Sequence, residues 1–174
     1  MALYSASVEY GLHCLLYLVD ASGNAKASSN DLAEFQGISP SYVAKLFTQL
    51  KTAGLVRSIE GAQGGYQLAR PAQDITVLDV VEALEGEKPL FQCKEIRRQC
   101  ALFDSLPPGW ATKGVCSIHA VMLEAESRMK QSLANHTLAD LSQRVDRKAP
   151  KTFSMNVNAW FEDRRASKSR RPST

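Results

Sequence analysis

The stretch from residue 39 to residue 70 constrains the fold of this chain most, because it joins a well-marked helix to a short hairpin. Ser39 is a favourable N-cap, and Pro40 suits the first helical position, whose backbone N–H has no partner within a helix. Gly54 ends this helix, and two short alternating segments around a glycine-rich turn predict a two-stranded hairpin. One apolar face of the helix is formed by four residues at helical spacing: Val43, Leu46, Phe47 and Leu50. A helix followed by such a hairpin predicts a winged helix-turn-helix.

The opposite side of this helix is polar and mildly basic, as expected of a surface that reads DNA. Lys45 and Gln49 have side chains that can meet base edges, whereas Arg57, Arg70 and the wing amides can hold phosphates. Glycines at the wing tip allow the backbone to approach a phosphate closely. The predicted DNA-binding residues are Ser39, Ser41, Tyr42, Lys45, Gln49, Arg57, Gln63, Gly64, Gly65 and Arg70. The alternative is a winged helix that is used only for protein contacts.

Composition and length are those of an ordinary globular chain. The 174 residues are 44% hydrophobic and carry a formal net charge of +3, which by itself argues only weakly for nucleic acid. No basic-then-apolar leader opens the sequence, and the longest apolar run, from Cys14 to Val19, is too short to span a bilayer. We therefore expect a cytoplasmic protein with no membrane contact.

Apolar spacing and capping patterns predict further helices on both sides of the hairpin. The spacing of apolar residues predicts a first helix over about residues 5–21. Ser28 with Asp31, and Thr76 with Asp79, are acidic variants of a capping box, and each starts a helix that a glycine ends.

The second half of the chain begins with a long loop, residues 87–115, and a loop of this length is usually functional or disordered. Ser117 can cap a helix that reaches about Ala134 and whose apolar seam suits a dimer interface or a core. Thr137 starts one more short helix. Farther on, three apolar residues are candidates for docking: Val157, Trp160 and Phe161. The end of the chain is expected to be a disordered basic tail that contains Arg164, Arg165, Lys168, Arg170 and Arg171.

Three of the four cysteines lie in or next to the long loop, which indicates metal or redox chemistry in a cytosolic chain. Cys93 and Cys100 are followed by Cys116, with His119 three residues later. Thiolates suit zinc, copper(I) and iron-sulfur clusters. Zinc is not favoured, because the loop has no Cys-x-x-Cys pair. The fourth cysteine, Cys14, lies on the apolar side of the first helix and is expected to be a small buried side chain.

Glu9 and His13 are four residues apart and therefore share one face of the first helix, beside its apolar stripe. This pair can bind a metal ion. From the spacing alone, an ion pair between the two side chains on a solvated or dimer-facing surface is the favoured interpretation.

Several motifs together closely resemble the Rrf2 family of bacterial transcription regulators, over about residues 2–145. The motifs are Ala53-Gly54-Leu55-Val56, Gly64-Gly65-Tyr66, Leu68-Ala69-Arg70-Pro71 and the segment 75–86. The resemblance implies a dimeric cytoplasmic repressor or activator, and several members of the family sense through an iron-sulfur cluster. It also implies that the helix from Ser117 is a long dimerisation helix, which pairs two recognition helices for a double-stranded DNA operator with two-fold symmetry.

Three further segments, residues 8–14, 91–97 and 112–118, resemble a subgroup of this family whose 2Fe-2S cluster has mixed ligands. The resemblance implies that Cys93 and Cys116 hold one iron, while Glu9 and His13 of the other subunit hold the second. Cys100 and His119 are then spare residues, and either could replace a ligand.

The sequence thus predicts a mainly α fold with a small β wing, that is, a winged helix-turn-helix plus a long dimerisation helix. We expect a DNA-binding domain over 1–86, a cluster-binding loop over 87–116, a dimerisation segment over 117–145 and an extension over 146–174. The function predicted is redox or nitrosative-stress sensing by a homodimeric transcription regulator. The alternatives are control by cysteine oxidation, by a small molecule or by a partner protein. No base with an orienting acid adjoins the cysteines in the sequence, so we do not expect an enzyme.

Overall fold

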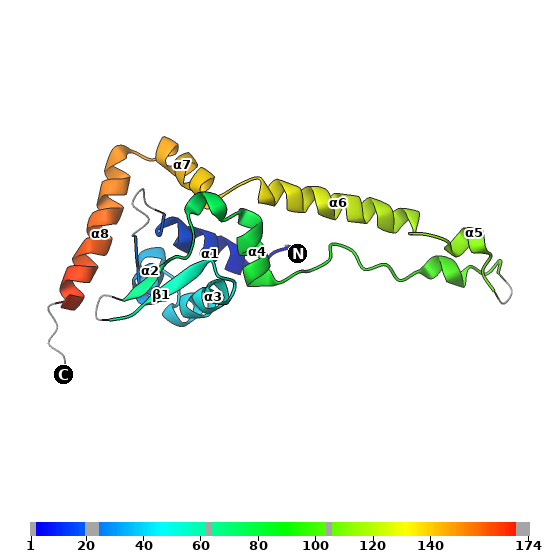
Figure 1. The fold of residues 1–174 in the computed structure, drawn as a ribbon, viewed down its shortest axis with the longest axis horizontal. Coiled ribbons are helices and arrows are strands. Elements are labelled where there is room, and N and C mark those ends of the chain that lie inside the picture. The colour runs from blue at the N-terminus through cyan, green and yellow to red at the C-terminus, as the bar shows by residue number, and fades with distance from the viewer. Residues whose placement is uncertain (1–2, 20–24, 62–63, 104–105, 170–174) are drawn as a thin grey trace. The chain divides into compact units, whose positions relative to one another are not determined.

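The computed structural model describes residues 3–19, 25–61, 64–103 and 106–169 (Figure 1). The chain forms two compact units, one of Met1–Gly86 with Leu133–Thr174 and the other of Glu87–Ser132. Within the described ranges, no helix is both long enough and apolar enough to cross a membrane.

The first unit holds a winged helix-turn-helix and two later helices. Its β-strands pair antiparallel, from Val56 opposite Leu68 to Ile59 opposite Gly65, as expected for a wing. Ala27 adds a bridge to this sheet through two backbone hydrogen bonds with Tyr66. The elements are α1 (Ala6–Leu16), α2 (Ser29–Gln36), α3 (Pro40–Thr52), β1 (Val56–Ile59), β2 (Gly65–Leu68), η1 (Ala72–Asp74), α4 (Val77–Glu85), α7 (Leu138–Lys148) and α8 (Lys151–Ser169). The fold is mainly helical with a two-stranded wing, as predicted.

Side-chain caps define where three helices of this unit begin. Both predicted capping boxes are present, at Ser28 with Asp31 and at Thr76 with Asp79. A third box at Thr137 starts α7, which continues to Lys148 and is longer than the short helix expected there. Backbone hydrogen bonds bridge the starts of α4 and α7, including 2.8 Å from the Val77 N–H to the His136 carbonyl. The two helix starts are therefore fixed to each other.

The core of the unit forms around α3, whose predicted apolar face is buried. Among the described residues, the largest fully buried side chain is that of Phe47, which is 0% exposed. Gly11 lies at the close contact of α1 with α4, and a Cβ atom at that position would lie 2.4 Å from a methyl carbon of Leu84, which would have to move. The first helix ends at Leu16, earlier than expected, and residues 20–24 lie outside the described ranges.

The second unit carries the long loop and most of the predicted dimerisation helix. That helix, α6 (Ser117–Ala134), is 18 residues long and begins where expected. The loop contains two short helical segments that the sequence did not predict, η2 (Ile96–Gln99) and α5 (Gly109–Thr112). The apolar face of α6 is not fully covered in the single chain, since Ile118 and Val121 on it are exposed.

The expectation of a disordered basic tail is wrong for Arg164, Arg165 and Lys168, which lie on the helix α8 (Lys151–Ser169). The three apolar residues expected to dock explain the difference, because Phe161 is buried and Trp160 and Val157 pack on the same core. Arg164, Arg165 and Lys168 therefore lie on a packed helix. Arg170 and Arg171 lie outside the described residues.

The wing predicts one stability effect. A Cβ atom on Gly65 would lie 2.6 Å from the carbonyl oxygen of Ala27, which accepts the Tyr66 N–H at 2.8 Å. We expect Gly65→Ala to lower the free energy of unfolding by about 1–3 kcal/mol, because the bridge must open to admit the methyl group. Urea denaturation measures the effect. Gly109→Ala is the control, since a Cβ atom there meets nothing within 4 Å, and equal stability of the two variants would contradict the analysis.

Candidate functional site

The outward face of α3 offers a small set of side chains for contact with bases. Ser41 and Lys45 are exposed, and Tyr42 and Gln49 are half-buried. The hydroxyl of Thr48 is already engaged, because it donates to the Ala44 carbonyl at 2.9 Å, one turn earlier. Lys45 and Gln49 therefore remain the candidates for base contacts from the middle of the helix.

The start of α3 presents two hydroxyls. Ser39 occupies the N-cap position, as predicted, but its side chain makes no capping hydrogen bond. Its hydroxyl instead lies 2.8 Å from that of Ser41, and both residues are exposed. A helix N-terminus with exposed hydroxyls suits a phosphate oxygen.

The predicted DNA-binding residues of the wing differ in exposure and in their contacts. Arg57 is exposed on β1, whereas Arg70, after β2, forms an ion pair at 3.5 Å with Asp79 and keeps 42% of its side chain exposed. Gly64 lies at the turn, where a Cβ atom would be 2.5 Å from the Ile59 carbonyl oxygen, so the tight turn excludes larger residues. Gln63 lies outside the described residues.

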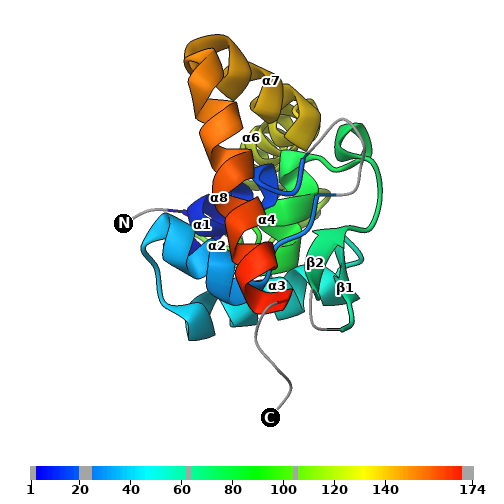
Figure 2. The same cartoon turned by 90° about the vertical axis from the view of Figure 1, so that its left-hand side faces the viewer.

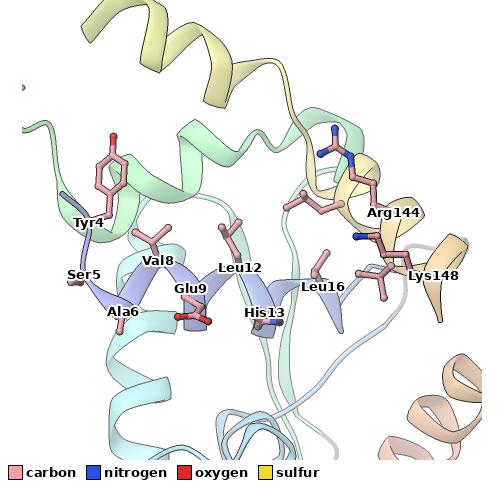
Figure 3. Close-up of a pocket in the computed structure, with 12 residues that line it drawn as sticks. Tyr4, Ser5, Ala6, Val8, Glu9, Leu12, His13, Leu16, Arg144 and Lys148 are labelled. Atoms are coloured by element: carbon pink, nitrogen blue, oxygen red, sulfur yellow. The ribbon is translucent and has the colours of Figure 1, made fainter. Parts of the chain in front are cut away.

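Glu9 and His13 lie side by side along α1 and are both exposed (Figure 3). Within the described part of the chain, no ion pair joins them. They border an open hollow of about 730 Å³ between α1 and α7, to which Arg144 and Lys148 contribute basic side chains. A carboxylate and an imidazole, two different metal-binding groups, are thus adjacent at this surface.

Cys116 immediately precedes α6, and its environment favours the thiolate. Backbone N–H groups of His119 and Ile118 donate to the sulfur and lower the pKa of the Cys116 thiol. The nearby guanidinium of Arg97 acts in the same direction, against the opposing effects of partial burial and of Glu95. A thiol that ionises readily is suited to metal ligation and to oxidation.

Arg97 connects the segments that carry Cys93 and Cys116. Its Nη2 donates to the carbonyl of Gly114 at 2.6 Å, and its Nε donates to Glu95 Oε2 at 2.7 Å. The other oxygen of Glu95 accepts from Cys93 Sγ at 3.7 Å. Glu95 and Arg97 therefore connect Cys93 to the backbone two residues before Cys116.

The remaining candidates are Cys100, His119 and Cys14. Cys100 follows η2 and is half-buried, and the ring of His119 lies 6.1 Å from that of Phe91. Cys14 is 0% exposed, and burial raises the pKa of its thiol to about 12, so it remains protonated. Among the described residues of this single chain, no three His, Cys, Asp or Glu side chains form a group that could hold a metal ion.

Sequence reasoning did not single out Arg97 or Glu95. Both lie in the segment 91–97 that carries part of the family resemblance, and in a cluster of charges from Lys94 to Arg98. Nothing in that cluster indicates that Arg97 contacts backbone seventeen residues away, as its bond to Gly114 does.

Comparisons with known proteins agree with this geometry. Residues 4–144 match the family model of Rrf2, described as an iron-dependent transcriptional regulator. Protein rrf2 of Nitratidesulfovibrio vulgaris is 39% identical over 132 residues, which cover 76% of this chain and 81% of that protein.

Two solved structures of regulators are also similar to this chain. CymR, the global cysteine regulator of B. subtilis, is similar with a TM-score of 0.63 and 25% identity, over 83% of this chain and 98% of that chain. IscR of T. potens is similar with a TM-score of 0.62 and 28% identity, over 88% of this chain and 96% of that chain.

The geometry of α3 predicts which side chains read bases. We expect Lys45→Ala and Gln49→Ala each to reduce discrimination between a selected duplex and a shuffled one by about 1–3 kcal/mol. Fluorescence anisotropy with a duplex selected by the protein from a random-sequence library provides the measurement. Lys51→Ala is the matched control on the same helix, and equal loss of discrimination in Lys51→Ala would contradict the assignment.

The environment of Cys116 predicts a pH profile. In metal-free protein with Cys93→Ser and Cys100→Ser, alkylation by iodoacetamide should reach half its maximal rate at a pH below that of an ordinary cysteine. Because the cation stabilises the thiolate, Arg97→Gln should move this midpoint to higher pH. Mass spectrometry of the modified peptide gives the rates. A midpoint that does not move would exclude a role for Arg97.

Proposed function

This chain belongs to the Rrf2 family of DNA-binding transcriptional regulators, and on this premise we propose that it senses redox or nitrosative stress through a 2Fe-2S cluster. The cluster would bridge two copies of the chain. The observation that carries the proposal is the Arg97 network, which connects the segments of two thiols, one of them inclined to ionise.

The chemistry of the donors fits an iron-sulfur cluster. Cys93 and Cys116 offer soft thiolates, and Glu9 and His13 offer a carboxylate and an imidazole on one exposed face. When bound, such a cluster exchanges one electron. Ligation by neutral imidazole in place of thiolate removes negative charge, which raises the reduction potential as histidine does in Rieske centres. The second ring nitrogen of His13 can hold a proton, so electron and proton transfer would be coupled.

A dimer explains why the donors lie in two separate units of one chain. The exposed apolar seam of α6 supports pairing with a second copy, because Ile118 and Val121 would otherwise remain in water. In such a dimer, Glu9 and His13 of one subunit would complete the site that Cys93 and Cys116 of the other begin.

A direct contact links the proposed ligands to the DNA-reading helix. Tyr10, next to Glu9 on α1, packs edge-on against Tyr42 of α3 with ring centroids 5.8 Å apart. A shift of α1 at the cluster would therefore move the first turn of α3. Since an operator with two-fold symmetry requires a fixed spacing between recognition helices, a small rotation would change affinity.

A thiol switch is the second candidate. The lowered pKa of Cys116 favours it, because a thiolate is the form that oxidants attack. Cys93 and Cys100 would then supply the partner thiols, without iron. This candidate predicts a colourless protein that still binds DNA.

The absorbance spectrum of anaerobically purified protein tests the cluster, together with the number of iron and acid-labile sulfide ions per chain. We expect about two of each and bleaching by dithionite. His13→Ala and Glu9→Ala should each lose or alter the visible bands while the helical circular dichroism stays unchanged. Cys100→Ser is the control and should keep the bands. Unchanged absorbance in both ligand variants would remove the proposal.

A mixed dimer tests whether the site bridges two chains. Chains with His13→Ala and with Cys116→Ser, each carrying a different affinity tag, are co-expressed and the mixed dimer is isolated. If ligands come from both subunits, this dimer keeps one intact site and half of the wild-type iron. If each site lies within one chain, both sites are damaged and the iron is lost.

A further inference from the structure

The C-terminal helix α8 lies beyond residues 4–144 of the family match and packs on α2 (Figure 2). Phe161 is 7% exposed, and its ring lies 5.2 Å from that of Phe35 and 5.8 Å from that of Tyr17. Trp160 packs edge-on against Phe35 at 4.9 Å. This aromatic contact holds α8 on the helix-turn-helix.

The end of α8 contacts the chain just before and at the start of α2. Arg165 Nη1 donates to the carbonyl oxygen of Lys26 at 3.2 Å. Lys168 Nζ donates to the Ser28 hydroxyl at 3.0 Å and lies 2.5 Å from Asp31 Oδ2. Because the carboxylate of Asp31 belongs to the capping box of α2 and the residue is 6% exposed, it needs a cation close by. Lys168 supplies that cation, which fixes the end of α8 to the start of α2.

The segment that α8 contacts, residues 26–28, also pairs with the wing. The backbone of Ala27 is joined to that of Tyr66 in β2 by hydrogen bonds of 3.1 and 2.8 Å. Arg165, Lys168 and Gly64 of the wing turn line one small hollow together with this segment. Residues 26–28 therefore lie between the end of α8 and the wing, and both contact them.

The position of the wing depends on what it packs against, because a two-stranded hairpin alone is only marginally stable in water. Tyr66 makes two such contacts. Its ring packs against that of Phe47 in α3, with ring centroids 4.8 Å apart, and its backbone forms the bridge to Ala27. The bridge can hold the wing in place only if residues 26–28 are themselves held, and α8 holds them through its contacts on either side of Ala27.

We propose that α8 positions the wing for contact with the DNA backbone by fixing residues 26–28, and that Arg165 and Lys168 are the positioning residues. Both cations are engaged within the protein, Lys168 by Asp31 and Arg165 by Glu162 at 3.9 Å. Their role is therefore to hold the chain and not to contact phosphates. The inference rests on the DNA-binding activity of the family and is independent of the iron-sulfur proposal.

Lys168→Met in the full chain tests this role by amide hydrogen exchange and by DNA binding. Exchange measured by NMR should become faster at Tyr66, while Leu46 in the buried part of α3 keeps its rate and shows that the fold persists. Fluorescence anisotropy should show weaker binding to a selected and to a shuffled duplex by the same factor, since the wing holds phosphates and α3 reads bases. Arg165→Gln should act in the same direction. Lys151→Met removes an equal charge from the exposed start of α8 and should change neither measurement.

A double-mutant cycle with Gly65→Ala separates positioning from a direct contact of Lys168 with DNA. The added methyl group opens the bridge between Ala27 and Tyr66, so Lys168→Met should weaken DNA binding much less in this background. An equal effect in both backgrounds would overturn the positioning role, and so would unchanged exchange at Tyr66. If the unaltered chain bound neither duplex, the DNA-binding premise would fail and the proposal with it.

Discussion

Burial of Phe47 is the interaction on which the DNA-binding surface depends. This side chain is fully enclosed, and burial of a side chain of its size stabilises a fold by roughly 1.5–3 kcal/mol. Because Phe47 lies on the inner face of α3, Lys45 on the same helix must face outward. The ring of Tyr66 in β2 packs against Phe47 at 4.8 Å, so one side chain positions both the recognition helix and the wing.

Local signals made most of the fold predictable from the sequence. The start of α3, both capping boxes and the beginning of α6 depend on residues within a few positions of one another, and all are confirmed. The division of the chain into functional domains and the DNA-binding and metal-binding residues stay predictions. The error lay at the C-terminus, where a basic composition predicted disorder. Ion pairs with Asp31 and Glu34, 130 or more residues away in the sequence, hold α8 in place, and no local pattern indicates them.

The candidate metal site was likewise predictable from the sequence only in part. The residue types and spacing of the cysteines indicated a soft-donor site, but not how the loop would bring two of them together. Arg97 links the segments that carry them by donating to the backbone before α6, and Glu95, whose backbone is left-handed, contacts both Arg97 and Cys93. Such contacts join segments that are far apart in sequence, and a pattern of charges cannot specify them.

The bridge between the starts of α4 and α7 has a consequence for how this protein family can diversify. The chain leaves the DNA-binding unit at Gly86 and is fixed again at His136, on the helix it has just left. Residues 87–132 thus form an excursion whose two ends both join the DNA-binding unit. Lengthening such a segment costs little free energy of loop closure, about 0.6 kcal/mol for each doubling of its length. The excursion can therefore gain, lose or exchange ligands while the DNA-binding frame is preserved, so one scaffold can be adapted to different signals.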